Sequence, residues 1–277
     1  MGKGPIFKAI AADVAGSELS FPTSARVAMK VREALDDPEC HVDAAAKLVQ
    51  AEPLLAARIV AAANSVAYNR SGREITDVRT AVARLGFRTV RSLAMALVTR
   101  QLAGTPAGKA EQTLAAQLWE HTAHVASLAH VIARHITKVD PETAMFAGIV
   151  HEVGGFYLLS RAGKFPGLLD DGFDEWLESG EAEVSGAVLD VLAVPAPVRE
   201  AVRDYWAGYL AIPPASLGDT LLLAEELSPV PSPLHRIDPD EERVPANIDF
   251  VLGEDTLTGI LAESAEEVAS LTEALKF

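Results

Sequence analysis

The sequence predicts an all-α protein. Apolar side chains recur at steps of three and four, which is the spacing of one helix face. The clearest example is the set Leu114, Leu118, Val125, Leu128 and Ile132. No segment in the first half of the chain alternates between apolar and polar residues as a half-buried strand does. Together these patterns favour helices and give no support to a sheet in that half.

The first hundred residues contain the signals of several short helices. Residues 1–18 are expected to form a tail or a short helix. Five helices follow, each bounded by a capping residue, a proline or a glycine. Thr76 is expected to cap the fourth helix, and Gly86 is expected to end it. The expected ranges are residues 23–35, 42–50, 52–63, 77–85 and 87–102.

Two longer helices are predicted in the centre of the chain. The first carries the apolar stripe that begins at Leu114. The second begins at Asp140, a capping residue that is followed by a proline at the first helical position. Gly154 and Gly155 are expected to stop this second helix. The short connection around Lys138 predicts that the two helices pack antiparallel.

This antiparallel arrangement brings His121 toward His151 and Glu152. Imidazole and carboxylate groups together suit iron, manganese or zinc, so the three residues are candidate metal ligands. The alternative is a buried core histidine beside a charge at a helix end. The spacing by itself favours this structural alternative, because an intact metal site needs more ligands than these.

Composition limits the class of protein. The 277 residues allow one large domain or two small ones, with 49% apolar and 23% charged residues. The single cysteine, Cys40, excludes an internal disulfide and fits a reducing compartment. Residues 1–15 lack the apolar core of a signal peptide, and the longest uncharged run, 205–218, is too short to cross a bilayer. These features predict a soluble, cytoplasmic protein without a membrane partner.

Charge is unevenly distributed along the chain. The first 100 residues carry a net charge of +4 and the remaining residues carry −19, for a total of −15. An acidic protein of this kind repels nucleic acid. We therefore expect other proteins as partners and no nucleic acid.

Several short motifs occur in a fixed order in the first half of the chain. They are Phe21-Pro22 with Asp36-Asp37-Pro38, Glu52-Pro53-Leu54-Leu55-Ala56-Ala57-Arg58, Ala63-Asn64-Ser65 and Ala81-Val82-Ala83-Arg84-Leu85-Gly86. Their order and spacing resemble the HDOD family, the HD-related output domain of bacterial signalling proteins. The likeness runs from about residue 19 to residue 211. It implies a two-lobed helical bundle, with an N-terminal five-helix lobe (about 19–105) packed on a degenerate HD-like lobe (110–211).

Four residues of these motifs are expected to have structural roles: Pro53, Asn64, Ser65 and Gly86. Asn64 follows an alanine-rich helix, where its amide can bond helix-end carbonyls or a neighbouring loop. Beyond the motifs, residues 212–277 contain a proline-rich segment and a last helix that reaches residue 275. This helix is expected to pack on the HD-like lobe or to serve in self-association, and the sequence leaves both open.

The second half resembles the HD superfamily of metal-dependent phosphohydrolases at His121 and at the pair His151-Glu152. That resemblance implies an aspartate where Glu152 stands and a second one where Glu225 stands. Two downstream segments in which relatives carry histidines contain none. The resemblance therefore implies a vestigial site at these four residues, with no catalytic residue, no cofactor and no metal. If an ion binds at all, His121, His151 and Glu152 are its expected ligands.

Two hypotheses of different class follow for the function. The favoured one is a non-enzymatic bacterial signal-transduction module that acts through contacts with other signalling proteins. The alternative is a metal-dependent phosphohydrolase or phosphodiesterase that uses His121, His151, Glu152 and Glu225. A third, weaker hypothesis is a small-ligand sensor that keeps the old HD cavity as a pocket.

Overall fold

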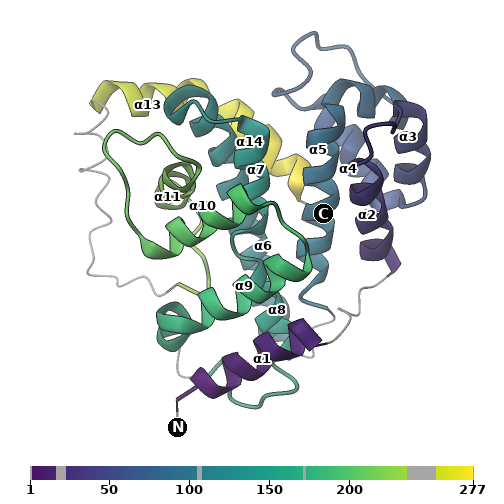
Figure 1. Ribbon diagram of the computed structural model, residues 1–277. Helices are drawn as coiled ribbons and strands as arrows, with labels where there is room; N and C mark the ends of the chain where they lie inside the picture. The colour runs from purple at the N-terminus through teal and green to yellow at the C-terminus, as the bar shows by residue number, and fades with distance from the viewer. Residues whose placement is uncertain (1, 17–22, 105–107, 171–172, 236–253, 277) are drawn as a thin grey trace.

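The computed structural model describes residues 2–16, 23–104, 108–170, 173–235 and 254–276. These residues form helices and connecting loops without a strand, which confirms the all-α prediction (Figure 1). The helices of the first part are α1 (Gly4–Gly16), α2 (Thr23–Ala34), α3 (Val42–Gln50), α4 (Pro53–Asn64) and α5 (Val78–Gln101). The helices that follow are α6 (Lys109–Ile132), α7 (Pro141–Val150), α8 (Val153–Arg161), α9 (Glu181–Val191), α10 (Ala196–Ala207), α11 (Leu217–Glu226), α13 (Glu254–Glu263) and α14 (Ala265–Leu275).

Helix α5 is the element on which α2, α3 and α4 pack. Its start corrects one expectation, because Asp77 is the N-cap and its side chain accepts from Thr80 N at 2.8 Å, whereas Thr76 was expected in that position. Gly86 interrupts the helix with φ 75° and ψ 164°, a conformation that a side chain would strain. The fourth and fifth predicted helices are therefore two helical runs that meet at Gly86.

Asn64 ties the end of α4 to the loop that precedes α5. Its side-chain nitrogen donates to the carbonyls of Val60 at 3.0 Å and Ile75 at 2.7 Å. Its side-chain oxygen accepts from Ile75 N at 2.8 Å. The amide thus bonds both a helix-end carbonyl and a neighbouring loop, as its position in the sequence suggested. Pro53 stands in the first turn of α4 and Ser65 is the C-cap residue of this helix.

Helices α6 and α7 form the central antiparallel pair. Asp140 caps α7 by accepting from Thr143 N at 2.9 Å, as predicted. The pair approaches closely at Gly148, where an added Cβ would lie 2.6 Å from the Cα of Ala126 in α6. The absence of a side chain at Gly148 therefore allows the backbones of α7 and α6 to approach closely near the end of α7.

The predicted stop of α7 at Gly154 and Gly155 is wrong. Helix α7 ends at Val150, and both glycines lie buried in the first turn of the next helix, α8. A Cβ on Gly154 would lie 2.8 Å from the backbone of Ser185 in α9, and one on Gly155 would lie 2.5 Å from the side chain of Leu234. These glycines therefore permit close packing of α8 and do not terminate α7.

The two ends of the described chain pack on its middle. Helix α1 lies against α9 (Figure 1), and Phe7 makes an edge-to-face contact with Trp176 at 5.7 Å between ring centroids. The last helix was expected to be continuous, but it is interrupted at Ser264 between α13 and α14. Helix α14 packs on both α4 and α6, and Trp119 of α6 donates to the Leu275 carbonyl at 3.1 Å.

The larger buried apolar cluster of the described residues extends from α1 to α14. It includes Phe7, Leu93, Ile149 and Leu275. The division into two lobes and the boundaries near residues 105, 110 and 211 stay predictions. Within the described ranges, no helix combines the length and apolar character that a membrane crossing needs.

Candidate functional site

His121 lies on the buried face of α6, in the apolar stripe that the sequence predicted. Its side chain has no exposed surface. Its Nδ1 lies 2.7 Å from the carbonyl oxygen of Val230, and because a carbonyl can only accept, Nδ1 carries the proton. This bond directs Nε2 toward the end of α7.

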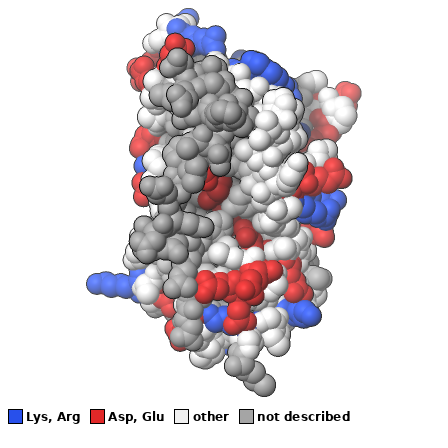
Figure 2. Space-filling model, turned by 90° about the vertical axis from the view of Figure 1, so that its left-hand side faces the viewer, with Lys and Arg blue, Asp and Glu red and all other residues white. Residues whose placement is uncertain are grey.

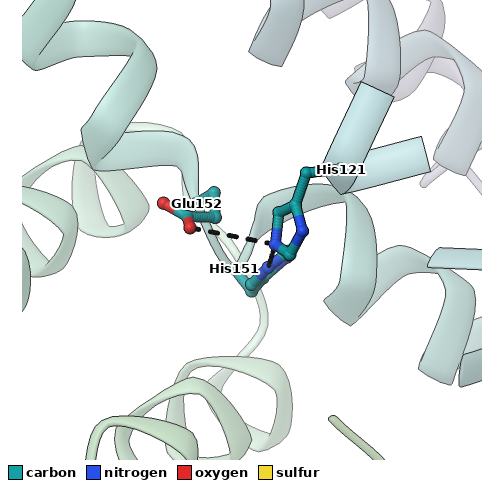
Figure 3. Close-up of side chains that lie close together, drawn as sticks. All are labelled: His121, His151 and Glu152. Carbon is teal, nitrogen blue, oxygen red and sulfur yellow. Dashed lines mark hydrogen bonds and ion pairs between the residues drawn. The ribbon is translucent and has the colours of Figure 1, made fainter. Parts of the chain in front are cut away.

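His151 is the C-cap residue of α7, and its side chain is also fully buried. Its Nδ1 donates to the Gly148 carbonyl at 2.7 Å, which leaves Nε2 to face α6. The Nε2 atoms of His151 and His121 are 3.4 Å apart (Figure 3). The antiparallel pair thus brings the two histidines together, as expected from the sequence.

Glu152 stands between α7 and α8, and its side chain is completely buried. One carboxylate oxygen, Oε1, accepts from the hydroxyl of Ser232 at 2.7 Å and lies 3.9 Å from Nε2 of His121 (Figure 3). The other oxygen, Oε2, is buried and makes no hydrogen bond. A buried carboxylate oxygen without a partner is unfavourable, so this atom marks a position where a ligand would be stabilised.

Glu225 of α11 completes the set of four residues that the sequence singled out. Its Oε2 lies 3.1 Å from Nε2 of His121 and 3.6 Å from Nε2 of His151. Helix α11 packs on both α6 and α7, which places this carboxylate beside the two rings. All four predicted positions therefore converge.

Two further residues of the cluster were missed by the sequence analysis. His235 follows α11 in the proline-rich segment, and Glu181 is the first residue of α9. Nε2 of His235 lies 3.5 Å from Glu152 Oε1 and 3.9 Å from Glu181 Oε1, while its Nδ1 lies 3.6 Å from Glu225 Oε1. Glu181 stands at the start of a helix and His235 stands among prolines, and neither position carries a local signal of a ligand.

We refer to these six residues as the His–Glu cluster: His121, His151, Glu152, Glu181, Glu225 and His235. None of the contacts given above involves the four motif residues Pro53, Asn64, Ser65 and Gly86. Those four residues belong to α4 and α5 and to the turn that follows α4.

Burial and neighbouring charges shift the pKa values of the residues in the His–Glu cluster. Burial alone lowers the pKa of a histidine, but the neighbouring carboxylates outweigh burial at His121 and raise its pKa. At His235 the same balance raises the pKa to about 11. Burial raises the pKa of Glu225, but the three imidazoles outweigh it and hold that pKa well below its ordinary value. At Glu181, burial prevails and raises the pKa.

The segment between α11 and His235 closes the cluster. Val230 and Ser232 of this segment bond His121 and Glu152, so the chain lies directly over both side chains. Glu225 and His235 keep 21% and 23% of their side-chain surface exposed, and Glu181 keeps 8%. Among the described residues, this segment therefore shields the inner side chains His121 and Glu152.

The donor set itself fits a divalent metal ion. Two overlapping groups have ligand atoms within 4.8 Å of one another, and Glu152 belongs to both. The first adds His121 and His151, and the second adds Glu181 and His235. Imidazole nitrogens and carboxylate oxygens are ligands for zinc, manganese and iron, and the unpartnered Oε2 of Glu152 is free to coordinate. When bound, such an ion supplies Lewis acidity and an acidic water.

The HDOD domain model matches residues 21–204. The chain belongs to the HDOD family. This family is a degenerate branch of the HD superfamily. His235 and Glu225 lie beyond the matched residues, so part of the cluster is built from outside the HDOD match. No curated protein matches this HDOD sequence.

Solved structures share the fold. A Shewanella amazonensis protein, provisionally named a metal-dependent phosphohydrolase, has a TM-score of 0.72 at 22% identity, with 99% of each chain covered. An HDOD domain protein of unknown function from Geobacter sulfurreducens has a TM-score of 0.64 at 21% identity, covering 98% of this chain and 97% of that one. A Marinobacter aquaeolei protein, provisionally named for signal transduction, has a TM-score of 0.61 at 17% identity, covering 99% and 66%. HDOD membership and this fold fit a signalling module.

Proposed function

We propose that this HDOD protein is a non-enzymatic bacterial signalling module that acts through contacts with other proteins. The closure of the His–Glu cluster is the observation that carries this proposal. His121, His151 and Glu152 have no exposed side-chain surface, and residues 228–235 lie over them. A phosphoester has no route to these atoms in this conformation.

The chemistry of hydrolysis explains why closure matters. A metal-dependent phosphohydrolase must place a metal-bound water in line with the phosphorus atom of its substrate. Catalytic metal sites accordingly keep an open coordination position, whereas structural sites are closed by protein ligands. In this protein the additional groups, Glu181 and His235, come from the chain itself and lie beside Glu152. We therefore propose that the site is vestigial with respect to catalysis.

A surface suited to protein contacts lies in the loop between α10 and α11. Tyr209 and Ile212 are large apolar side chains with 78% and 70% of their surface exposed. The loop is held by Asp219, whose carboxylate accepts from the backbone nitrogens of Ala211 and Ser216 at 2.9 and 2.8 Å. Exposed aromatic and aliphatic side chains on a fixed backbone are typical anchors of interfaces. We propose this loop as a contact surface for a signalling partner or for self-association.

The charge of the protein supports a protein partner and opposes a nucleic acid. Acidic side chains gather in the lower part of the face shown in Figure 2, among few basic ones. This agrees with the net charge of −15, which repels phosphate backbones. The single cysteine, Cys40, supports action in a reducing compartment such as the cytoplasm.

Two measurements test the proposal together. The purified protein is assayed with a chromogenic phosphodiester and a phosphomonoester in the presence of Mn²⁺, Mg²⁺ or Zn²⁺. We expect no turnover above a chelator control and no difference for His151→Ala. Crosslinking in the native cell, compared between wild type and a Tyr209→Ala, Ile212→Ser double variant, should show a protein adduct that the variant loses. Turnover that disappears in His151→Ala would overturn the proposal.

The second candidate function is metal-dependent phosphoester hydrolysis. The observation in its favour is the convergence of three imidazoles and three carboxylates, which is a larger ligand set than the sequence suggested. Under this candidate, residues 228–235 would have to move for the substrate to enter. Turnover with Mn²⁺ in the assay above would select it.

A further inference from the structure

Glu152, Glu181 and His235 lie together in the His–Glu cluster, and each has a buried polar atom without a hydrogen bond. Oε2 of Glu152, Oε1 of Glu181 and Nε2 of His235 are all buried and make no hydrogen bond. Glu152 and Glu181 are 0% and 6% exposed. Most buried polar atoms in proteins form a hydrogen bond. Three neighbouring side chains that each carry a buried atom without one therefore indicate a ligand between them.

The separations among these three side chains approach those around a metal ion, since one ligand atom of each lies within 4.8 Å of the others. Nε2 of His235 lies 3.5 Å from Glu152 Oε1 and 3.9 Å from Glu181 Oε1. Ligands at about 2.0–2.2 Å from a tetrahedral ion lie about 3.3–3.6 Å from one another. Small side-chain adjustments would therefore bring all three into coordination distance.

The groups behind these atoms hold them in an orientation suited to coordination. Nδ1 of His235 faces Glu225 Oε1 at 3.6 Å, on the opposite side of the ring from Nε2. Metal-binding histidines usually direct their second nitrogen to a carboxylate or a carbonyl in this way. Glu152 Oε1 is held by the Ser232 hydroxyl at 2.7 Å, so Glu152 is supported as well.

Charge balance favours a divalent cation in this place. A divalent ion between Glu152 and Glu181 would compensate the charge of two buried carboxylates, and Nε2 of His235 would complete its ligands. Nitrogen and oxygen donors of this kind select zinc, manganese or iron over calcium or magnesium.

We propose that Glu152, Glu181 and His235 form a closed, non-catalytic site for a divalent transition-metal ion, with zinc as the first candidate. The ion would link three separate segments: the start of α8, the start of α9 and the segment that follows α11. This ligand set differs from the expected set His121, His151 and Glu152, because Glu181 and His235 replace the two helix histidines. It also departs from the sequence-based expectation of no metal, because His235 and Glu181 converge only in the folded chain. The proposal does not depend on the proposed function.

The test uses the full chain after removal of metals with a chelator and dialysis. Zn²⁺, and separately Mn²⁺ and Co²⁺, are titrated while metal content, Tm and the Co²⁺ absorption spectrum are recorded. We expect one equivalent of ion per chain and a rise in Tm of about 5 °C or more at saturating metal. His235→Gln and Glu181→Gln should each weaken binding by about tenfold or more. The control His41→Gln removes an exposed imidazole and should bind like wild type.

Three outcomes would overturn the site. They are no stoichiometric ion in wild type, unchanged binding in both His235→Gln and Glu181→Gln, and binding that His121→Gln abolishes while these two variants retain it. Circular dichroism checks the fold of each variant, and either of the two variants suffices if the other does not fold. Phosphoesterase turnover is a separate measurement, so metal binding without turnover supports this site and leaves the proposed function standing.

Discussion

Nε2 of His121 in α6 lies 3.1 Å from Oε2 of Glu225 in α11. The pair connects the central helix of the protein to a helix near its end, and it is the shortest ion-pair contact of the His–Glu cluster. Burial lowers the pKa of His121, but the carboxylates of Glu225 and Glu152 outweigh burial and raise that pKa. The first prediction concerns this pair.

Replacement of Glu225 by Gln should destabilise the protein by about 1–3 kcal/mol at pH 7, because it removes the carboxylate that faces the buried ring nitrogens of His121 and His151. Urea unfolding of metal-free protein measures the change. Glu226→Gln is the matched control, since Glu226 is the next residue of α11 and is exposed. Equal stability of the two variants would show that Glu225 does not stabilise the cluster.

A second prediction concerns the contact between α8 and α9. Gly154→Ala should destabilise the protein by about 1–3 kcal/mol, because the added Cβ would lie 2.8 Å from the backbone of Ser185. Gly186→Ala in α9 is a control of opposite sign. A Cβ there meets nothing within 4 Å, so helix propensity should stabilise the protein by up to about 1 kcal/mol. Thermal and urea unfolding of both variants measure whether each substitution lowers or raises the free energy of unfolding.

The third prediction concerns Asn64. Asn64→Ala should cost about 2–3 kcal/mol, because it leaves the N–H and carbonyl groups of Ile75 without their partner. Asn64→Asp should be at least as harmful above pH 5, since a carboxylate oxygen would face the carbonyls of Val60 and Ile75. Urea unfolding gives both values. Gln50→Ala, at the exposed end of α3, is the control and should change stability by less than about 0.5 kcal/mol.

The fourth prediction is a dependence of stability on pH through Asp219. Burial raises the pKa of this carboxyl, but hydrogen bonds from the backbone nitrogens of Ala215, Ala211 and Ser216 outweigh burial and lower the pKa. A lowered pKa in the folded state means that ionised Asp219 stabilises the protein above the unfolded pKa of about 3.9. This stabilisation is lost as the pH falls from there through the folded pKa.

Urea unfolding between pH 6 and pH 3 tests this dependence with Asp219→Asn. The variant should be less stable than wild type at pH 6, and the difference should shrink below about pH 4. Asp204→Asn, an exposed aspartate of α10, provides the control and should follow the wild-type curve. A difference that stays constant across the range would assign the effect of Asp219→Asn to lost geometry and not to ionisation.

Most helix positions could be predicted from the sequence because their signals are local. Asp140 caps α7, Gly86 interrupts α5, and the apolar stripe of α6 fixes the side on which His121 is buried. A short connection between α6 and α7 then suffices to bring His121 and His151 together, since neighbouring antiparallel helices leave few alternatives. Half of the candidate site was therefore accessible from spacing alone.

Only the tertiary structure decided the rest of the site. The sequence suggested that Gly154 stops a helix. In the structure, glycine is needed there because the backbone of Ser185 in α9 packs against it. Glu181 and His235 join the cluster through contacts between segments that no sequence periodicity relates, and a proline-rich loop carries His235 to its place. Local patterns specify helices because each hydrogen bond of a helix spans four residues. The content and closure of the site depend on long-range packing, which the order of residues does not reveal.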